Sequence, residues 1–202
     1  MLPEAVDFNV ICLSTGNADS LGQTRERELK ESVGHLFANS ARNVQLFQFD
    51  YTDGKNVTWD AEAVSSTLEN EVFLPQHKEE NVLLTFDPYG VSSHPNHISC
   101  HDAAEMMLQS NGTVTSVIYL DSHSRNFVMK YSSFFWSLLK VLRNKFSSNY
   151  VKEITLISTY PQYLLSLATM TNAHQSQLVW FRYGWWFFSS FVFSNDLKIV
   201  YS

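Results

Sequence analysis

The stretch Asn81–His97, NVLLTFDPYGVSSHPNH, contains the clearest indication of the fold in this sequence. Its first six residues form a mostly apolar run of the length and composition that a buried strand has. The turn Asp87–Gly90 follows, and a helix is predicted from about Asn96 to Gln109. A buried strand that leads through a turn into a helix is typical of a parallel sheet covered by helices.

The rest of the chain repeats this alternation of strand and helix. Strands are predicted at 10–13, 43–49, 115–120 and 153–158, and helices at 24–39, 60–73 and 161–174. A further apolar stretch lies at 131–142, and no internal repeat or linker interrupts the order. The predicted fold class is therefore α/β, with a Rossmann-like, mostly parallel sheet and helices on both faces, in one domain over residues 1–202.

The composition excludes several classes of protein. The chain has 202 residues, with 14 Lys and Arg against 20 Asp and Glu, which gives a formal net charge of −6. A nucleic-acid-binding protein normally presents a basic face, so nucleic acid is not an expected partner. Two cysteines cannot build a disulfide scaffold or a four-cysteine zinc site, so we expect a reduced protein.

The aromatic residues concentrate in the segment Tyr183–Phe193, YGWWFFSSFVF. This segment either forms part of the core or contacts a membrane surface. It has more aromatic side chains than one helix face can bury. The second interpretation is favoured, because Trp and Tyr are enriched at the bilayer interface. No apolar run reaches the about 20 residues that a spanning helix needs, and the first residues lack the pattern of a signal peptide.

Three histidines, His94, His97 and His101, follow the strand at 81–86. In open α/β sheets, ligands bind at the carboxyl ends of the strands. His94 is expected at the helix N-cap, with Pro95 at the first helical position, and His97 is expected in the first turn on nearly the same side. Two converging imidazoles suit a metal ligand with a catalytic partner, although a polar helix start with surface histidines remains the alternative. His101 lies one turn further along.

Other candidates lie at the ends of two predicted strands. The loop 14–22 is rich in hydroxyl, amide and glycine residues, so its backbone can approach an anionic or sugar ligand. It lacks the G-x-G-x-x-G pattern of a nucleotide site. Arg25 is a candidate clamp for a phosphate or hydroxyl group, or else it pairs with Glu28 on the surface. Asp87 either orients one of the histidines or forms the turn before Pro88.

Three segments spread over nearly the whole chain carry a family likeness: Phe8–Leu29 (FNVICLSTGNADSLGQTREREL), Leu83–His97 and Ala173–Trp186 (AHQSQLVWFRYGWW). They resemble the fungal N-acetylglucosaminyl-phosphatidylinositol de-N-acetylases, members of the LmbE-like (PIG-L) family of zinc deacetylases. The resemblance implies a zinc-dependent hydrolase that removes the acetyl group from this glycolipid in the second step of GPI-anchor biosynthesis. It also implies that the protein acts at the endoplasmic reticulum membrane, on the cytosolic face.

The same resemblance implies roles for single residues. His97, the second histidine of the His-x-x-His stretch, matches a ligand of Zn²⁺. His94, the first, matches the catalytic histidine that stabilises the oxyanion or protonates the leaving amine. Arg25, Asn17 and Glu28 match the substrate-binding pattern of the family.

One motif of the family does not occur in these 202 residues. Its other metal ligands come from a His-Pro-Asp-Asp segment at the end of a first strand, and no such segment is present. We therefore expect a sheet without its first strand and an incomplete zinc site, because a catalytic zinc site has three protein ligands. The chain is expected to be N-terminally truncated, without this segment and the membrane anchor that precedes it, and so should bind zinc weakly and lack deacetylase activity. The alternative is a catalytically dead relative that binds the glycolipid or a protein partner at the endoplasmic reticulum membrane.

Overall fold

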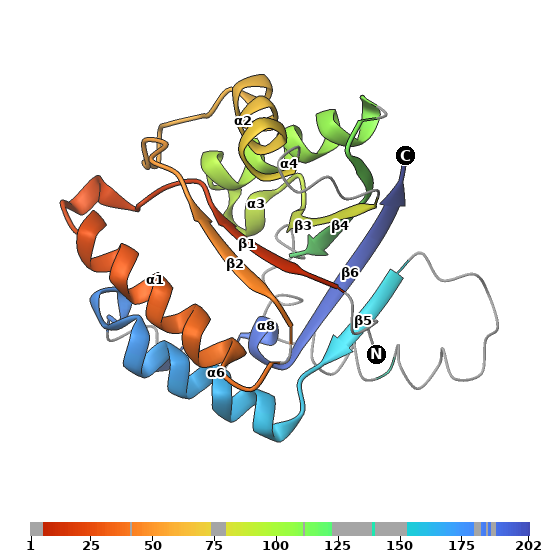
Figure 1. Ribbon diagram of the computed structural model, residues 1–202. Helices are drawn as coiled ribbons and strands as arrows, with labels where there is room; N and C mark the ends of the chain where they lie inside the picture. Colours follow the sequence, from red (N-terminus) through yellow and green to blue (C-terminus); the bar gives the residue numbers. More distant parts are fainter. Residues whose placement is uncertain are drawn as a thin grey trace. The chain divides into compact units, whose positions relative to one another are not determined.

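The computed structural model describes residues 6–40, 42–73, 80–110, 112–122, 139, 153–179, 183–184, 186 and 189–202 (Figure 1). The chain divides into two compact units, each assembled from two separate stretches. The first unit comprises Met1–Gly54 and Thr159–Phe187, and the second comprises Lys55–Ser158 and Phe188–Ser202. The single domain over 1–202 stays a prediction.

The first unit is built on a parallel strand pair. Strands β1 (Phe8–Cys12) and β2 (Val44–Gln48) pair over their whole length. The short 3-10 helix η1 (Asn17–Asp19) and the long helix α1 (Gly22–Phe37) connect them. A strand, a helix and a parallel strand form the βαβ arrangement that the alternating sequence pattern predicts.

A second helix of this unit comes from the far end of the chain. Helix α6 (Tyr160–Ala173) lies beside α1, and the 3-10 helix η4 (Gln175–Gln177) follows it (Figure 1). The start of α6 is fixed by a capping box, in which the side chains of Thr159 and Gln162 satisfy backbone groups of the first turn. Thr169 and Ala173 are the buried residues of this helix.

The second unit contains a four-stranded sheet with the order β3-β4-β6-β5. Strands β3 (Asn81–Phe86) and β4 (Val114–Asp121) run parallel. Strand β6 (Ser194–Tyr201) pairs antiparallel with β4 on one side and with β5 (Glu153–Ile157) on the other.

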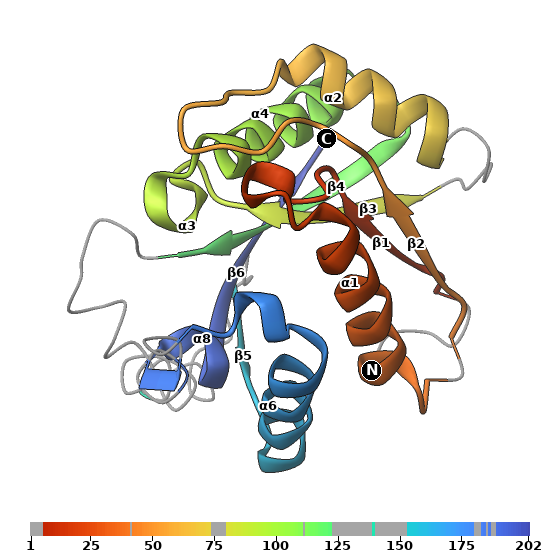
Figure 2. The same cartoon turned by 90° about the vertical axis from the view of Figure 1, so that its left-hand side faces the viewer.

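The helices of this unit form its core with β3 and β4. Helix α2 (Ala61–Leu68) continues into the π-helix η2 (Glu69–Phe73), and the one-turn helix α3 (Gly90–Ser93) precedes α4 (Pro95–Gln109). Another short helix, α8 (Ser190–Phe193), precedes β6. Figure 2 shows α2 and α4 on the same side of β3 and β4, and α4 packs on both strands. The most deeply buried apolar side chains are Val64, Val72, Ala103, Ala104, Val114 and Val117.

The α/β class is confirmed, and β1 with β2 and β3 with β4 pair in parallel as predicted, whereas the predicted strand β5 pairs antiparallel with β6. Asp60 is the N-cap of α2, and its side chain accepts a hydrogen bond of 2.9 Å from the backbone N–H of Glu62. Strand β6 was not predicted, and it makes the four-stranded sheet mixed. The apolar stretch at 131–142 lies outside the described residues apart from Leu139, as do several residues of the aromatic segment. Among the described residues, no helix has the length and apolar character needed to cross a membrane.

Candidate functional site

The turn that follows β3 has an unusual backbone. The φ angles of Gly90, Val91 and Ser93 are 53°, 64° and 59°. This region suits glycine but costs other residues about 1–3 kcal/mol. Two backbone hydrogen bonds hold the segment, from Gly90 N–H to the Asp87 carbonyl at 2.9 Å and from Ser93 N–H to the Tyr89 carbonyl at 2.8 Å. A strained turn at the carboxyl end of a parallel strand is a place where α/β proteins bind ligands.

His97 lies in the first turn of α4, and its ring is held from two sides. Its Nδ1 lies 3.1 Å from the carbonyl oxygen of Gly90. Its ring stacks on the ring of Phe86, with centroids 4.1 Å apart and planes 14° apart. A side chain at position 90 would place its Cβ 2.9 Å from the Cβ of His97, so this close approach requires glycine.

His94 is the N-cap residue of α4 and is half-buried. Its ring centroid lies 5.0 Å from that of His97, with the two planes tilted by 34°. The buried Nδ1 of His94 has no hydrogen-bond partner among the described residues. Buried polar atoms are normally paired, so this nitrogen marks a place where a ligand or water completes the bonding. The convergence of His94 and His97 predicted from their spacing is therefore present in the structure.

Asp87 forms the turn rather than contacting the histidines. Its Oδ1 accepts a hydrogen bond of 3.1 Å from the backbone N–H of Tyr89. Its Oδ2 accepts two from Ser122, from the backbone N–H at 2.7 Å and from the hydroxyl at 2.6 Å. Ser122 directly follows β4, so the carboxylate connects the carboxyl ends of β3 and β4. Ser122 was not singled out in the sequence, because nothing local relates it to Asp87.

In the first unit, Arg25 stabilises the loop between β1 and α1. Its guanidinium donates to the carbonyl oxygen of Gly16, and it donates to the carboxylate of Asp19 at 2.8 Å. Its buried Nε has no partner among the described residues. Asn17 accepts a hydrogen bond of 3.0 Å from the backbone N–H of Gly22 and so satisfies one donor at the start of α1. Asn17 thus lies in this loop, and Arg25, near the start of α1, contacts it.

Glu28 is only 5% exposed and does not form the predicted surface pair with Arg25. Its carboxylate accepts hydrogen bonds from the backbone N–H of Ser176 at 2.7 Å and from the hydroxyl of Ser176 at 2.6 Å. This contact connects α1 with the segment that follows α6. The side chain of Glu28 therefore holds two elements of the first unit together, and the structure places it away from solvent.

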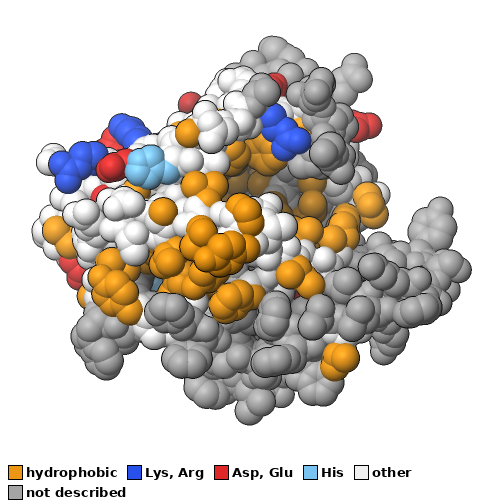
Figure 3. Space-filling view, turned by 90° about the horizontal axis from the view of Figure 1, so that it is seen from below, with side chains coloured by type: hydrophobic (Ala, Val, Ile, Leu, Met, Phe, Trp, Pro, Cys, Tyr) orange, Lys and Arg blue, Asp and Glu red, His pale blue; other side chains and the backbone are white. Residues whose placement is uncertain are grey.

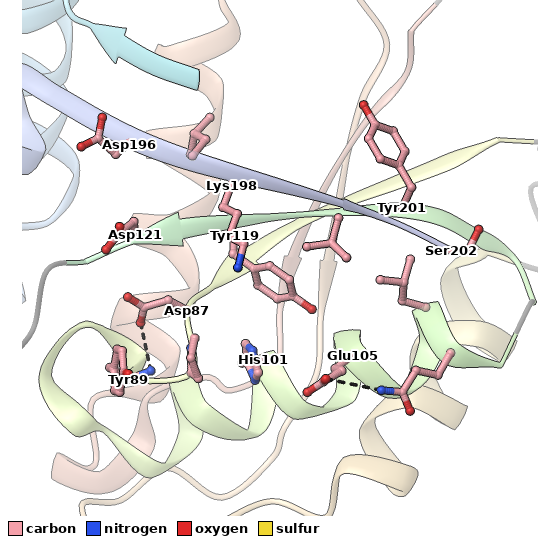
Figure 4. Close-up of a pocket in the computed structure, with 15 residues that line it drawn as sticks. Asp87, Tyr89, His101, Glu105, Tyr119, Asp121, Asp196, Lys198, Tyr201 and Ser202 are labelled. Atoms are coloured by element: carbon pink, nitrogen blue, oxygen red, sulfur yellow. Dashed lines mark hydrogen bonds between the residues drawn. The ribbon is translucent and has the colours of Figure 1, made fainter. Parts of the chain in front are cut away.

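His101 lies on the face of α4 that lines a hollow of about 820 Å³ in the second unit (Figure 4). Its Nδ1 lies 3.0 Å from the carboxylate of Asp102, and its ring centroid lies 4.9 Å from that of Tyr119 on β4. Burial raises the pKa of Tyr119, and the carboxylates of Glu105 and Asp102 raise it further. No local pattern in the sequence distinguishes Tyr119 from any other strand tyrosine.

The described residues include no group of three or more His, Cys, Asp or Glu side chains that could hold a metal ion. The ring of His97 suits a metal ligand, because one nitrogen contacts a backbone carbonyl, an arrangement common in metal-binding histidines. A catalytic zinc site has three protein ligands. The donor set of the described residues therefore fits one ligand of such a site and does not form the whole site.

The fold and the paired imidazoles define an α/β protein with a site suited to acid–base or metal-assisted chemistry. Residues 2–108 match the family described as PIG-L, GlcNAc-PI de-N-acetylase. The chain is 40% identical to the N-acetylglucosaminyl-phosphatidylinositol de-N-acetylase of Saccharomyces cerevisiae, over 98% of this chain and 72% of that protein. It is 30% identical to the probable enzyme of the same name from Schizosaccharomyces pombe, over 94% of this chain and 73% of that protein. The Bos taurus de-N-acetylase is 29% identical, over 95% of this chain and 71% of its own length.

The chain belongs to the PIG-L family. The family resemblance seen in the sequence is thereby confirmed.

Proposed function

We propose that this protein hydrolyses the N-acetyl group of N-acetylglucosaminyl-phosphatidylinositol, which releases acetate and leaves a free amine on the sugar. The observation that carries the proposal is the pair of imidazoles, His94 and His97, in which the buried Nδ1 of His94 has no hydrogen-bond partner within the described part of the chain. Family membership supports the same reaction, because the relatives are named for it. In a cell, this reaction is the second step of GPI-anchor biosynthesis.

The two histidines have different roles in this proposal. Amide hydrolysis needs a proton for the departing nitrogen and a partner for the oxyanion that forms at the carbonyl. Imidazole exchanges protons most readily near neutral pH, and the buried Nδ1 of His94 has no hydrogen-bond partner among the described residues. His97 is proposed as one ligand of Zn²⁺, and the described residues do not supply the further ligands.

The loop between β1 and α1 is proposed to contact the substrate. Arg25 keeps its side chain 19% exposed while it bonds to the loop, so its charge is held in a fixed place near the surface. A guanidinium recognises phosphate or sugar hydroxyl groups, both of which the substrate carries. Asn17 shapes the same loop through its hydrogen bond to Gly22. Glu28 supports the loop indirectly, by fixing α1 against the segment at Ser176.

Contact with the endoplasmic reticulum membrane, on its cytosolic face, is proposed for the apolar side of α6. None of the 14 residues of this helix is charged. Leu164 and Leu165 are exposed on it, and Tyr183 and Trp186 line an adjoining hollow of about 570 Å³. Figure 3 shows exposed apolar side chains, in orange, gathered into patches on the face that it displays. Uncharged apolar surface with Tyr and Trp nearby is typical of proteins that lie on a bilayer.

Sedimentation with vesicles of phosphatidylcholine and phosphatidylinositol tests the membrane contact. Leu164→Glu combined with Leu165→Glu should reduce the bound fraction, because charged side chains oppose insertion into the interface. Leu36→Glu, at an exposed position of α1, is the control and should bind like the unchanged chain. Equal binding by all three proteins would exclude this face as the contact.

The hydrolysis is tested with the protein expressed from its own gene, by mass spectrometry of the extracted lipids. His94→Ala and His97→Ala should each raise the ratio of acetylated to deacetylated glycolipid, whereas His101→Ala on the same helix should not. The alternative function, binding of the glycolipid without hydrolysis, predicts that none of the three substitutions changes this ratio. An unchanged ratio in both His94→Ala and His97→Ala would therefore reject the proposed reaction.

A further inference from the structure

Asp87 is a buried charged group to which the proposed reaction gives no role. Its side chain is 5% exposed, yet both carboxylate oxygens are used, by three donors from Tyr89 and Ser122. Ser122 is fully buried. A carboxylate is costly to bury unless donors satisfy it, so these bonds fix the carboxylate in one position between the ends of β3 and β4.

The position of this carboxylate determines the path of the turn. Asp87 holds the turn with its side chain, through the N–H of Tyr89, and with its backbone, through the N–H of Gly90. The segment beyond contains Val91 at a φ of 64°, which a β-branched residue adopts only when its surroundings enforce it. Loss of the carboxylate bonds would allow the turn to relax and would displace the carbonyl group of Gly90.

The carbonyl group of Gly90 determines which nitrogen of His97 carries the proton. A carbonyl oxygen can only accept, so its 3.1 Å contact with Nδ1 requires the proton to be on Nδ1. In the neutral ring, the lone pair then belongs to Nε2. The stacked ring of Phe86 restricts the imidazole to this orientation.

We propose that Asp87 is a positioning residue, which acts through the turn and the Gly90 carbonyl to hold His97 in the tautomer with its lone pair on Nε2. This is the form in which Nε2 can bind a metal ion or accept a proton. That this tautomer matters for deacetylation rests on the proposed function. The assignment of the tautomer rests only on the contact between His97 and the Gly90 carbonyl.

Nitrogen-15 NMR of the imidazole rings in the full chain tests the proposal directly. Asp87→Asn offers one acceptor oxygen in place of two, so it cannot accept from both Tyr89 and Ser122. We expect His97 to be in the Nδ1–H form in the unchanged chain and to become a mixture of tautomers in Asp87→Asn. Ser99→Ala is the matched control, because Ser99 is buried in the same helix and its hydroxyl bonds to the Trp59 N–H at 3.0 Å. It should leave the ring signals of His97 unchanged.

A second variant keeps the test informative if Asp87→Asn does not fold. Ser122→Ala removes only the hydroxyl bond to Asp87 and should shift the His97 signals in the same direction by a smaller amount. The proposal is overturned if a folded Asp87→Asn protein, or Ser122→Ala in its place, keeps the ring signals of the unchanged chain. It is also overturned if Ser99→Ala shifts these signals equally.

The cellular lipid assay separates this proposal from the proposed reaction. Asp87→Asn should lower the deacetylation rate by about 10–100-fold, the usual effect of removing a residue that orients a ligand. If the unchanged protein does not deacetylate the lipid but the tautomer shifts in Asp87→Asn, the proposed function fails and the positioning role stands. If activity falls while the tautomer stays the same, the positioning role fails.

Discussion

Replacement of Gly90 by alanine should destabilise the chain by about 2–5 kcal/mol. The φ angle of 53° costs an alanine about 1–2 kcal/mol. The added Cβ would lie 2.9 Å from the Cβ of His97 and 3.1 Å from the backbone nitrogen of Ile98. Both distances are shorter than ordinary contacts, and overpacking of this kind costs about 1–3 kcal/mol more. The two costs add because one arises in the backbone and the other in the surroundings.

Urea unfolding, followed by circular dichroism, measures the difference in the free energy of unfolding. Gly34→Ala is the control, because this glycine lies within α1 and a Cβ there has no neighbour within 4 Å. Alanine at position 34 should stabilise the chain by about 0.5–1 kcal/mol, so the same substitution gives opposite signs at the two sites. A Gly90→Ala protein within about 0.5 kcal/mol of the unchanged chain, the range of a neutral surface substitution, would refute the reasoning.

Three further predictions concern other parts of the chain. Glu28→Gln keeps one acceptor oxygen for Ser176 in place of two, so it should lower the free energy of unfolding, measured in urea, by about 1–3 kcal/mol. Glu31→Gln, at an exposed position of α1, is the control and should have little effect. Burial raises the pKa of the Cys12 thiol, so less thiolate is present at a given pH, and the pH midpoint of its alkylation in a Cys100→Ser background should lie above that of an exposed thiol. A midpoint at or below the ordinary value would contradict this. His97→Ala should lower the Zn²⁺ content of the protein expressed from its own gene, because His97 is proposed as one ligand of the metal; an unchanged content measured by atomic absorption would contradict this.

The parallel strands could be predicted because each is a short apolar run between turn residues. β3 occupies Asn81–Phe86 as expected. β6 could not be recognised in the same way, because Asp196 and Lys198 interrupt its apolar pattern. Asp196 is nevertheless buried, since the hydroxyl of Thr155 donates to it at 2.5 Å. The hydrogen bond from Thr155, 41 residues away, allows Asp196 to be buried in a strand, and no local sequence pattern indicates that bond.

In the candidate site too, features set by local geometry could be predicted, whereas contacts with distant residues could not. The convergence of His94 and His97 followed from helix geometry, which fixes the spacing of neighbouring side chains. The hydrogen-bond partners of Asp87 and Glu28 did not follow, because Ser122 and Ser176 lie 35 and 148 residues further along the chain. Only tertiary packing brings these serines to the carboxylates, so the sequence indicated a possible role for each acid but not its partner.

The contact between Glu28 and Ser176 also has a consequence for biosynthesis. A ribosome that adds about 5–20 residues per second needs about 7–30 s to translate the 148 positions that separate them. For most of that interval α1 is present without α6, and throughout it the carboxylate of Glu28 lacks its final partner. The first unit can therefore be completed only after residues 55–158 of the second unit have been synthesised. We expect chaperones that bind nascent chains to protect the N-terminal segment during this delay, and destabilising substitutions in α1 to lower the yield of folded protein more than its stability alone would suggest.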